Sequence, residues 1–223
     1  MKTVVLACQS LQNEVKLAMK RANFTLPLVI LEENNHDVPT LLRENIQRKL
    51  DTLTQYDRVI LAFGTCGGAM VGLKTGNFEL ILPRVDDCLS ILMGSMERRQ
   101  EVLEGGFGIF LTDRWLLHEK NMRSELDRIE KRYSPEQAKK VIAVMYGKFD
   151  SLNVIDTGAY DVPSILPQTK ALAQRLNLTH RIQQGTTAYL EELLTGPWPK
   201  ERFIRIAPQT AVTGADTLMP SLM

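Results

Sequence analysis

The stretch Arg58-Val59-Ile60-Leu61-Ala62-Phe63 runs directly into Gly64-Thr65-Cys66-Gly67-Gly68, and this junction decides the fold. Its first part is a short run of apolar and β-branched residues, which predicts a buried strand. The glycines that follow predict a tight loop in place of a longer strand. We therefore expect Cys66 just beyond the end of a buried strand.

Strands and helices alternate on both sides of this junction. Further strands are predicted at residues 3–7, 26–31, 78–82, 108–111, 152–156, 179–183 and 203–206. Apolar residues at helical spacing predict helices at 10–22, 39–50, 89–102, 119–146, 163–176 and 187–194, with a break at Ser134-Pro135. This alternation is typical of an α/β fold with a mostly parallel sheet and helices on both faces. Two Rossmann-like halves are the alternative to one continuous sheet.

The pattern predicts a chain organised in three parts. Residues 1–150 form an α/β lobe that carries the cysteines, and residues 151–208 form a smaller α/β half packed on it. Residues 209–223 form a tail without any pattern, which we expect to be disordered.

Composition excludes several classes of partner. The chain has 223 residues, of which 44% are hydrophobic, and its 27 basic residues nearly balance its 26 acidic ones. A net charge of +1 gives no electrostatic reason to expect nucleic acid or an anionic membrane as partner. No stretch approaches the roughly 20 apolar residues of a membrane span, and the apolar start is too short for a signal peptide. We therefore expect a cytoplasmic protein with reduced cysteines, and an odd cysteine count also argues against a disulfide framework.

The three cysteines and one histidine occupy similar places in the predicted fold. Cys8 follows the first strand, His36 lies in the loop after the second, Cys66 follows the third, and Cys88 comes shortly after the fourth. Parallel strands end at one edge of a sheet, where ligands bind in such folds, so these side chains are expected to meet there. Thiolate and imidazole groups suit Zn²⁺ and, as an alternative, a [4Fe-4S] cluster. Without a CxxC pair, the tertiary fold has to assemble the ligands, and three half-buried thiols lining an ordinary pocket are the competing interpretation.

Residues near these positions are candidates for binding a ligand or orienting the metal ligands. Gly67 and Gly68 would allow close backbone approach to a bound group, although a tight turn is the more common use of such a pair. The cluster Arg84, Asp86 and Asp87 beside Cys88 would orient the ligands or bind an anion, while aspartate is also an ordinary helix cap. Thr112 and Trp115 follow the fifth strand at the same predicted edge, and Trp115 would stack on a flat ligand.

These residues resemble the bacterial and archaeal family called domain of unknown function 1638. The resemblance rests on motifs spread over most of the chain: Cys8 after the first strand, His36-Asp37-Val38-Pro39, Cys66-Gly67-Gly68-Ala69, Pro83-Arg84-Val85-Asp86-Asp87-Cys88, Gly94-Ser95-Met96-Glu97-Arg98, Thr112 with Trp115, Ile155-Asp156-Thr157-Gly158 and the strand 203–208. One departure is visible, because the family usually reads Cys-Gly-Asn-Gly where this chain has Cys-Gly-Gly-Ala.

The resemblance implies that Cys8, His36, Cys66 and Cys88 form one ligand set. Members of the family are often encoded beside corrinoid-dependent methyltransferases, which implies a role in one-carbon metabolism with a corrinoid protein or methyltransferase as partner. We expect a metal-binding protein that acts as an accessory or enzyme in corrinoid-linked methyl transfer, and no activity comes with the family name. Two alternatives remain, namely a scaffold for a methyltransferase and a metal-free protein binding an anionic or tetrapyrrole-like ligand through Gly67, Gly68, Arg84, Ser95 and Trp115.

Overall fold

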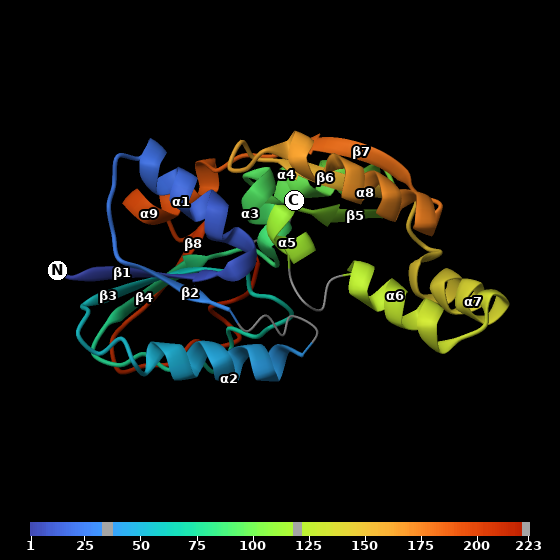
Figure 1. Ribbon diagram of the computed structural model, residues 1–223. Coiled ribbons are helices and arrows are strands. Elements are labelled where there is room, and N and C mark those ends of the chain that lie inside the picture. Colours follow the sequence, from blue (N-terminus) through green and yellow to red (C-terminus); the bar gives the residue numbers. More distant parts are fainter. Residues whose placement is uncertain (33–37, 118–121, 220–223) are drawn as a thin grey trace. The chain divides into compact units, whose positions relative to one another are not determined.

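The computed structural model of the chain describes residues 1–32, 38–117 and 122–219 (Figure 1). Its contacts divide the chain into two compact units, Met1–Arg98 with Thr186–Met223, and Arg99–Gly185. Each unit has its own sheet and its own helices, and both sheets are mostly or wholly parallel. The predicted α/β class is therefore confirmed. The boundary suggested near residue 150 falls inside the second unit.

The first unit is built on a five-stranded sheet in the order β2-β1-β3-β4-β8. Its strands are β2 (Leu28–Leu31), β1 (Thr3–Cys8), β3 (Arg58–Ala62), β4 (Glu79–Pro83) and β8 (Phe203–Ile206). The first four are parallel, and β8 pairs with β4 in the antiparallel direction. The carboxyl ends of β1, β3 and β4 consequently lie at one edge of this sheet.

Helices cover both faces of this sheet (Figure 1). α2 (Pro39–Leu50) covers one face, where Leu42 and Ile46 pack with Leu6 and Leu61 in a fully buried cluster. α1 (Gln12–Arg21), preceded by the 3₁₀ turn η1 (Gln9–Leu11), and α9 (Ala188–Thr195) cover the other face. Alternate residues of each strand point to opposite faces, so Cys8 belongs to the cluster under α2.

The segment after β8 packs on the first unit, although the sequence predicted a disordered tail. Val212 is 2% exposed and pairs with the loop before β4, since Gly72 N donates to Val212 O and Val212 N to Leu73 O, both at 2.8 Å. The Thr75 hydroxyl donates to Thr210 O at 3.0 Å. Because these contacts join residues far apart in the sequence, no local sequence pattern predicted that the segment around Val212 is ordered.

The second unit contains the parallel sheet β5-β6-β7. Its elements are β5 (Gly108–Leu111), α5 (Asp113–Leu117), α6 (Met122–Arg132), α7 (Pro135–Tyr146), β6 (Ser151–Asp156), α8 (Val162–Leu176) and β7 (Thr179–Gln184). Leu126 of α6 and Leu172 of α8 pack with Val154 of the sheet in one buried cluster. Ser134 caps α7 and Pro135 is its first residue, as the sequence predicted.

The helix predicted at residues 89–102 is two helices, α3 (Cys88–Met93) and α4 (Met96–Glu104). Gly94 ends α3 with a left-handed φ of 89°. The Ser95 hydroxyl then accepts a hydrogen bond from Arg98 N at 3.1 Å. A left-handed glycine followed by a capping serine ends one helix and starts another, and the apolar spacing alone hid this break.

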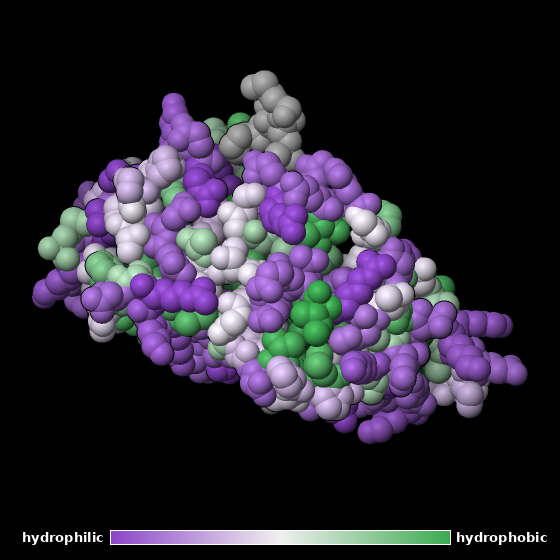
Figure 2. Space-filling model, turned by 90° about the horizontal axis from the view of Figure 1, so that it is seen from above, coloured by the Kyte–Doolittle hydropathy of each residue, from purple (hydrophilic) through white to green (hydrophobic). Residues whose placement is uncertain are grey.

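No helix in the described part of the chain combines the length and the apolar character that a membrane crossing demands. Figure 2 shows a face of the molecule on which hydrophilic residues predominate and hydrophobic residues form small groups.

Glu79 at the start of β4 joins neighbouring strands through an ion-pair cluster. Its carboxylate accepts hydrogen bonds from Arg58 Nε and Arg205 Nε, both at 2.9 Å, and its side chain is 18% exposed. Arg58 also stacks on Trp198, with 4.5 Å between the guanidinium carbon and the ring centroid. Burial opposes ionisation, but the hydrogen bonds and charges of the two arginines outweigh it and lower the pKa of Glu79.

Replacement of Glu79 by Gln is expected to lower the free energy of unfolding near pH 7 by about 1–2 kcal/mol. The lowered pKa means that the carboxylate stabilises the fold fully above its unfolded-state value of about 4.3, and that this contribution is lost as the pH falls further through the folded-state value. Urea denaturation of both proteins across this range measures the difference. A difference that is equal at neutral and strongly acidic pH would contradict the ion-pair explanation.

Candidate functional site

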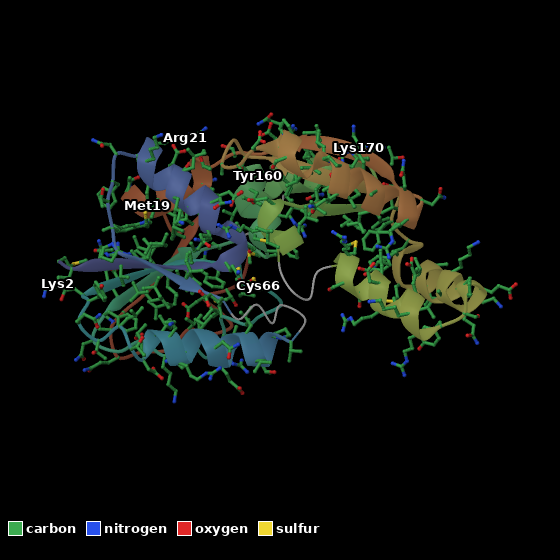
Figure 3. All side chains as sticks on the ribbon, viewed as in Figure 1. Lys2, Met19, Arg21, Cys66, Tyr160 and Lys170 are labelled. Carbon is green, nitrogen blue, oxygen red and sulfur yellow. The ribbon has the colours of Figure 1, made fainter. Side chains whose placement is uncertain are left out.

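The three cysteines lie where β1, β3 and β4 end. Cys8 is the last residue of β1, is 1% exposed, and has its Sγ 2.9 Å from the Ser10 hydroxyl. Cys66 lies in the loop after β3, at the end of the sheet opposite to Lys2 (Figure 3). Cys88 is the first residue of α3. All three are free thiols, and Cys66 and Cys88 are partly buried.

The loops that carry Cys66 and Cys88 are locked together by their backbones. Thr65 N donates to Val85 O and Cys66 N to Asp86 O, both at 2.8 Å. The Thr65 hydroxyl donates to the same Asp86 carbonyl at 3.2 Å. These bonds join the two loops beyond the end of the sheet and so hold the Cys66 loop against the segment that leads to Cys88.

Gly64 makes this close contact possible. A Cβ atom at this position would lie 2.6 Å from the Cα and carbonyl carbon of Asp87, a separation that packed atoms do not tolerate. The glycine is therefore required by the approach of the Cys88 loop, because the nearest atoms belong to backbone and cannot rotate away.

Asp86 and Asp87 fix the start of α3. The Asp87 side chain accepts a hydrogen bond from Ser90 N at 3.1 Å and so caps the helix. Asp86 Oδ1 accepts from Asp87 N at 3.0 Å and from the Ser90 hydroxyl at 2.7 Å. The capping explanation that the sequence offered for both residues accounts for these contacts, and the caps also orient the Cys88 segment.

Cys66 has an uncommon backbone conformation. Its φ is 45°, and the two glycines that follow are also left-handed, with φ of 67° at Gly67 and 84° at Gly68. The turn is closed by Gly68 N, which donates to Thr65 O at 3.0 Å. A non-glycine residue in the left-handed region costs on the order of 1 kcal/mol and persists only where the surroundings impose it. Such a position at a strand end is typical of functional residues.

The thiols interact electrostatically with one another. Burial raises the pKa of Cys66 to about 12, and nearby Cys8 and Asp87 add to this rise. Burial also raises the pKa of Cys88, together with Cys66, Cys8 and Asp87. Each thiol is thus close enough to disfavour the thiolate of another. A bound cation would reverse this balance, because it stabilises the charged form of its ligands.

The described side chains do not by themselves form a complete metal site. Across residues 1–32, 38–117 and 122–219, no three or more Cys, His, Asp or Glu side chains are arranged to hold a metal ion. His36, the fourth predicted ligand, lies outside these residues. The structure therefore brings Cys8, Cys66 and Cys88 to one sheet edge without placing their sulfur atoms in ligand geometry.

The remaining predicted residues have other contacts. Arg84 donates from Nε to Lys200 O at 2.7 Å and from Nη1 to Asp216 O at 2.6 Å, so backbone carbonyls accept from two of its three side-chain nitrogens. Ser95 starts α4, whereas Thr112 and Trp115 belong to the second unit. Thr112 is fully buried, with no hydrogen-bond partner for its hydroxyl among the described residues, and Trp115 is 40% exposed.

Two surface cavities lie away from the thiols. One of about 400 Å³ in the second unit is lined by Leu116, Arg123, Pro167, Gln168, Ala171, Leu172 and Arg175. The other, of about 420 Å³, lies between α2 and the loop before β4, where Arg43, Gln47 and Lys74 line it. The candidate ligand-binding residues contribute to neither cavity.

Sequence reasoning missed three residues that shape the site, namely Gly64, Ser10 and Ser90. Gly64 carried a signal, since it follows a buried strand directly, as Gly67 and Gly68 follow Cys66. Ser10 and Ser90 are 3% and 0% exposed, and each lies two residues after a cysteine. Serine at that spacing is too common to mark a site without the fold.

The fold and the thiol positions define an α/β protein with a cysteine cluster at the carboxyl edge of a parallel sheet. A family model described as "Protein of unknown function (DUF1638)" matches residues 30–194, and the chain belongs to this family. The matched region includes His36, Cys66 and Cys88, while Cys8 precedes it. No curated protein and no solved structure matches the chain.

Replacement of Gly64 by Ala is expected to lower the free energy of unfolding by about 1–3 kcal/mol, because the new methyl group overlaps the Asp87 backbone. The variant should also expose Cys66 and Cys88 to a thiol reagent such as DTNB. Gly214→Ala is the matched control, since no described atom lies within 4 Å of its added Cβ. Equal stability and equal thiol reactivity of the two variants would show that the loops are not locked at Gly64.

Proposed function

We propose that this protein binds one thiophilic metal ion, Zn²⁺ in the first instance, through the thiolates of Cys8, Cys66 and Cys88 and the imidazole of His36. The observation that carries the proposal is the position of the three thiols at the carboxyl edge of one sheet. Cys8 ends β1, and the loops that carry Cys66 after β3 and Cys88 after β4 are bonded to each other. Three thiolates and an imidazole supply the four soft donors that tetrahedral zinc requires. A cytoplasmic setting would keep these thiols reduced.

The surroundings of the thiols favour a functional cluster over three packed core residues. A structural cysteine behaves as a small apolar side chain and needs no special backbone. Here Cys66 adopts a left-handed conformation, and Ser10, Asp86 and Asp87 lie beside the thiols. Hydroxyl and carboxylate groups of this kind orient metal ligands and stabilise a positively charged centre.

The proposed role of His36 as the fourth ligand rests on the sequence analysis, because His36 lies outside the described residues. The described residues on either side of this stretch contact the cysteine-bearing segments. Leu31 at the end of β2 pairs with Cys8, and a Cβ on Gly67 would lie 3.3 Å from the Pro39 ring.

Metal binding would need local adjustment of the thiols. Since the described residues hold no ready-made group of three ligands, the sulfur atoms have to rotate toward the ion. The locked loops limit this change to side chains and to the turn around Cys66, because the backbone register between Thr65 and Val85 is already set. Binding should consequently stabilise the protein, as it does wherever a metal orders its own ligands.

Metal titration of the reduced, metal-free full chain tests the proposal. Wild type is expected to bind about one equivalent of Zn²⁺, and Co²⁺ in its place should give the thiolate charge-transfer absorption of a tetrahedral sulfur site. Cys66→Ser and Cys88→Ser should each weaken zinc binding by about 100-fold or more. His36→Ala should weaken it less severely, whereas His180→Ala should leave it unchanged, because His180 contacts Thr169 in the second unit.

Anaerobic purification separates zinc from the alternative cluster. A [4Fe-4S] centre would make the protein brown and would give iron and sulfide in equal amounts. A colourless protein with less than about half an equivalent of any metal would contradict both forms of the proposal.

A role in corrinoid-linked methyl transfer is a second proposal, and family resemblance supports it. A bound zinc ion would lower the pKa of a thiol and so favour the thiolate that accepts a methyl group. The zinc-loaded protein should then accelerate the reaction of methylcobalamin with a thiolate, which yields the methyl thioether and cob(I)alamin. Anaerobic absorbance measurements follow this reaction, and equal rates with wild type and Cys66→Ser would rule it out.

In the metal-free alternative, an anionic ligand would compete with backbone carbonyls for Arg84. Arg84 was the cation expected to hold an anionic ligand, and its guanidinium is bound to carbonyls of residues 200, 216 and 218. A ligand that binds equally well to wild type and to Cys88→Ser would favour this alternative over the metal centre.

A further inference from the structure

Arg202 holds α3, the short helix that begins with Cys88, from both of its ends. On one side its backbone carbonyl accepts a hydrogen bond from Arg84 N at 2.8 Å, four residues before Cys88. On the other side its Nη2 donates to the carbonyl of Gly94 at 3.2 Å, directly after the last residue of α3. Arg202, which is more than a hundred positions from Cys88 in the sequence, therefore bonds to the chain both before and after α3.

Arg202 is itself fixed by three contacts. Its Nε pairs with Glu192 Oε2 at 2.9 Å, and its guanidinium carbon lies 4.4 Å from the ring centroid of Tyr189. The Tyr189 hydroxyl donates to the Arg202 carbonyl, and Tyr189 is 2% exposed. An ion pair, a stacked ring and a buried hydroxyl together restrict both the backbone and the guanidinium.

α3 depends on such contacts because it is short. A helix of six residues gains little from its own hydrogen bonds and is not stable alone. Asp87 caps its start, and at its end Gly94 has a left-handed φ while Thr186 N donates to Leu92 O at 2.8 Å. The hydrogen bond from Arg202 to Gly94 completes the end of the helix that the Asp87 cap does not reach.

Arg84 extends the same support to the end of the chain. Its side chain donates to the carbonyls of Lys200, Asp216 and Leu218 at 2.6–2.9 Å. Asp216 in turn accepts hydrogen bonds from the backbone and hydroxyl of Thr213. The loop that leads to Cys88 is thereby bound to residues 200–202 and 213–218.

We propose that Arg202 is a positioning residue for the Cys88 thiol, and that together with Arg84 it forms a brace that sets α3 in register for metal binding. This inference rests on the proposed metal-binding function. The affinity of the proposed site for zinc would then depend on Arg202, although Arg202 donates no atom to the metal.

Arg205 provides a matched control three residues away. It also pairs with a carboxylate, that of Glu79 at 2.9 Å, and lies 5.8 Å from the ring of Trp198. Its described contacts are on β4 and the Trp198 loop, so its removal should cost stability without releasing α3. A comparison of the two variants separates positioning of Cys88 from a general loss of stability.

The test compares Arg202→Gln, Arg202→Lys and Arg205→Gln in the full-length protein. Zinc affinity, measured by competition with a chromophoric chelator, is expected to fall about 10-fold or more in Arg202→Gln and to change little in Arg205→Gln. Lysine keeps the charge beside Glu192 but not the fork that reaches both Glu192 and Gly94, so partial recovery is expected for Arg202→Lys. Thermal unfolding of each variant verifies that it is folded.

A readout without metal keeps the two proposals distinguishable. Hydrogen exchange of residues 88–94 in the metal-free protein should accelerate in Arg202→Gln and stay at the wild-type rate in Arg205→Gln. Equal effects of the two variants on exchange, or on zinc affinity, would overturn the inference. Wild type that binds no zinc would contradict the proposed function. If hydrogen exchange of residues 88–94 still differed between Arg202→Gln and Arg205→Gln, the inference that Arg202 holds α3 in position would remain.

Discussion

The backbone contact between the loops after β3 and β4 is the constraint on which the candidate site depends. Two amide–carbonyl hydrogen bonds, from Thr65 to Val85 and from Cys66 to Asp86, join the two loops beyond the end of the sheet. Gly64 permits this approach because the Asp87 backbone occupies the space of a side chain. Cys66 and Cys88 are thereby fixed relative to one another before any ligand is present. The left-handed turn at Cys66 and the capped start of α3 both lie at this contact between the two loops.

Local patterns in the sequence predicted much of the fold. The eight strands in the described residues were all expected near their observed positions, and most of them are short apolar runs between polar or glycine-rich segments, although β7 is largely polar. The parallel direction of β1, β2 and β3 followed from the helices between them, whereas the structure describes a loop without a helix between β3 and β4. The break between α3 and α4 was missed because Gly94 interrupts an apolar spacing that continues on both sides. The sequence also did not predict that β8 pairs with β4 in the antiparallel direction, because tertiary contacts decide this pairing.

For the candidate site, the sequence predicted the location better than the details. It placed Cys8, Cys66 and Cys88 at a common edge, and the three cysteines lie where β1, β3 and β4 end. It assigned Arg84 to a ligand, whereas Arg84 binds carbonyls about 130 residues further along the chain. Arg202 and Gly64 were overlooked because their importance lies in what the backbone of another segment brings next to them. The glycine after a buried strand was a weak signal for Gly64, whereas the contacts of Arg202 with residues 84 and 94 have no signature in a single sequence.

The order of segments in the first unit has a consequence for biosynthesis. Its last strand, β8, and the segment bound by Arg84 are made after the entire second unit, Arg99–Gly185. A ribosome that has just completed α3 has therefore produced all three cysteines, but not Arg202, which bonds to the end of that helix. The second unit, whose strands and helices are contiguous, can fold during synthesis, while the first must wait until its final strand has emerged. More than a hundred residues of elongation thus separate the synthesis of Cys88 from that of Arg202, so the surroundings of the three thiols are complete only when β8 has been made.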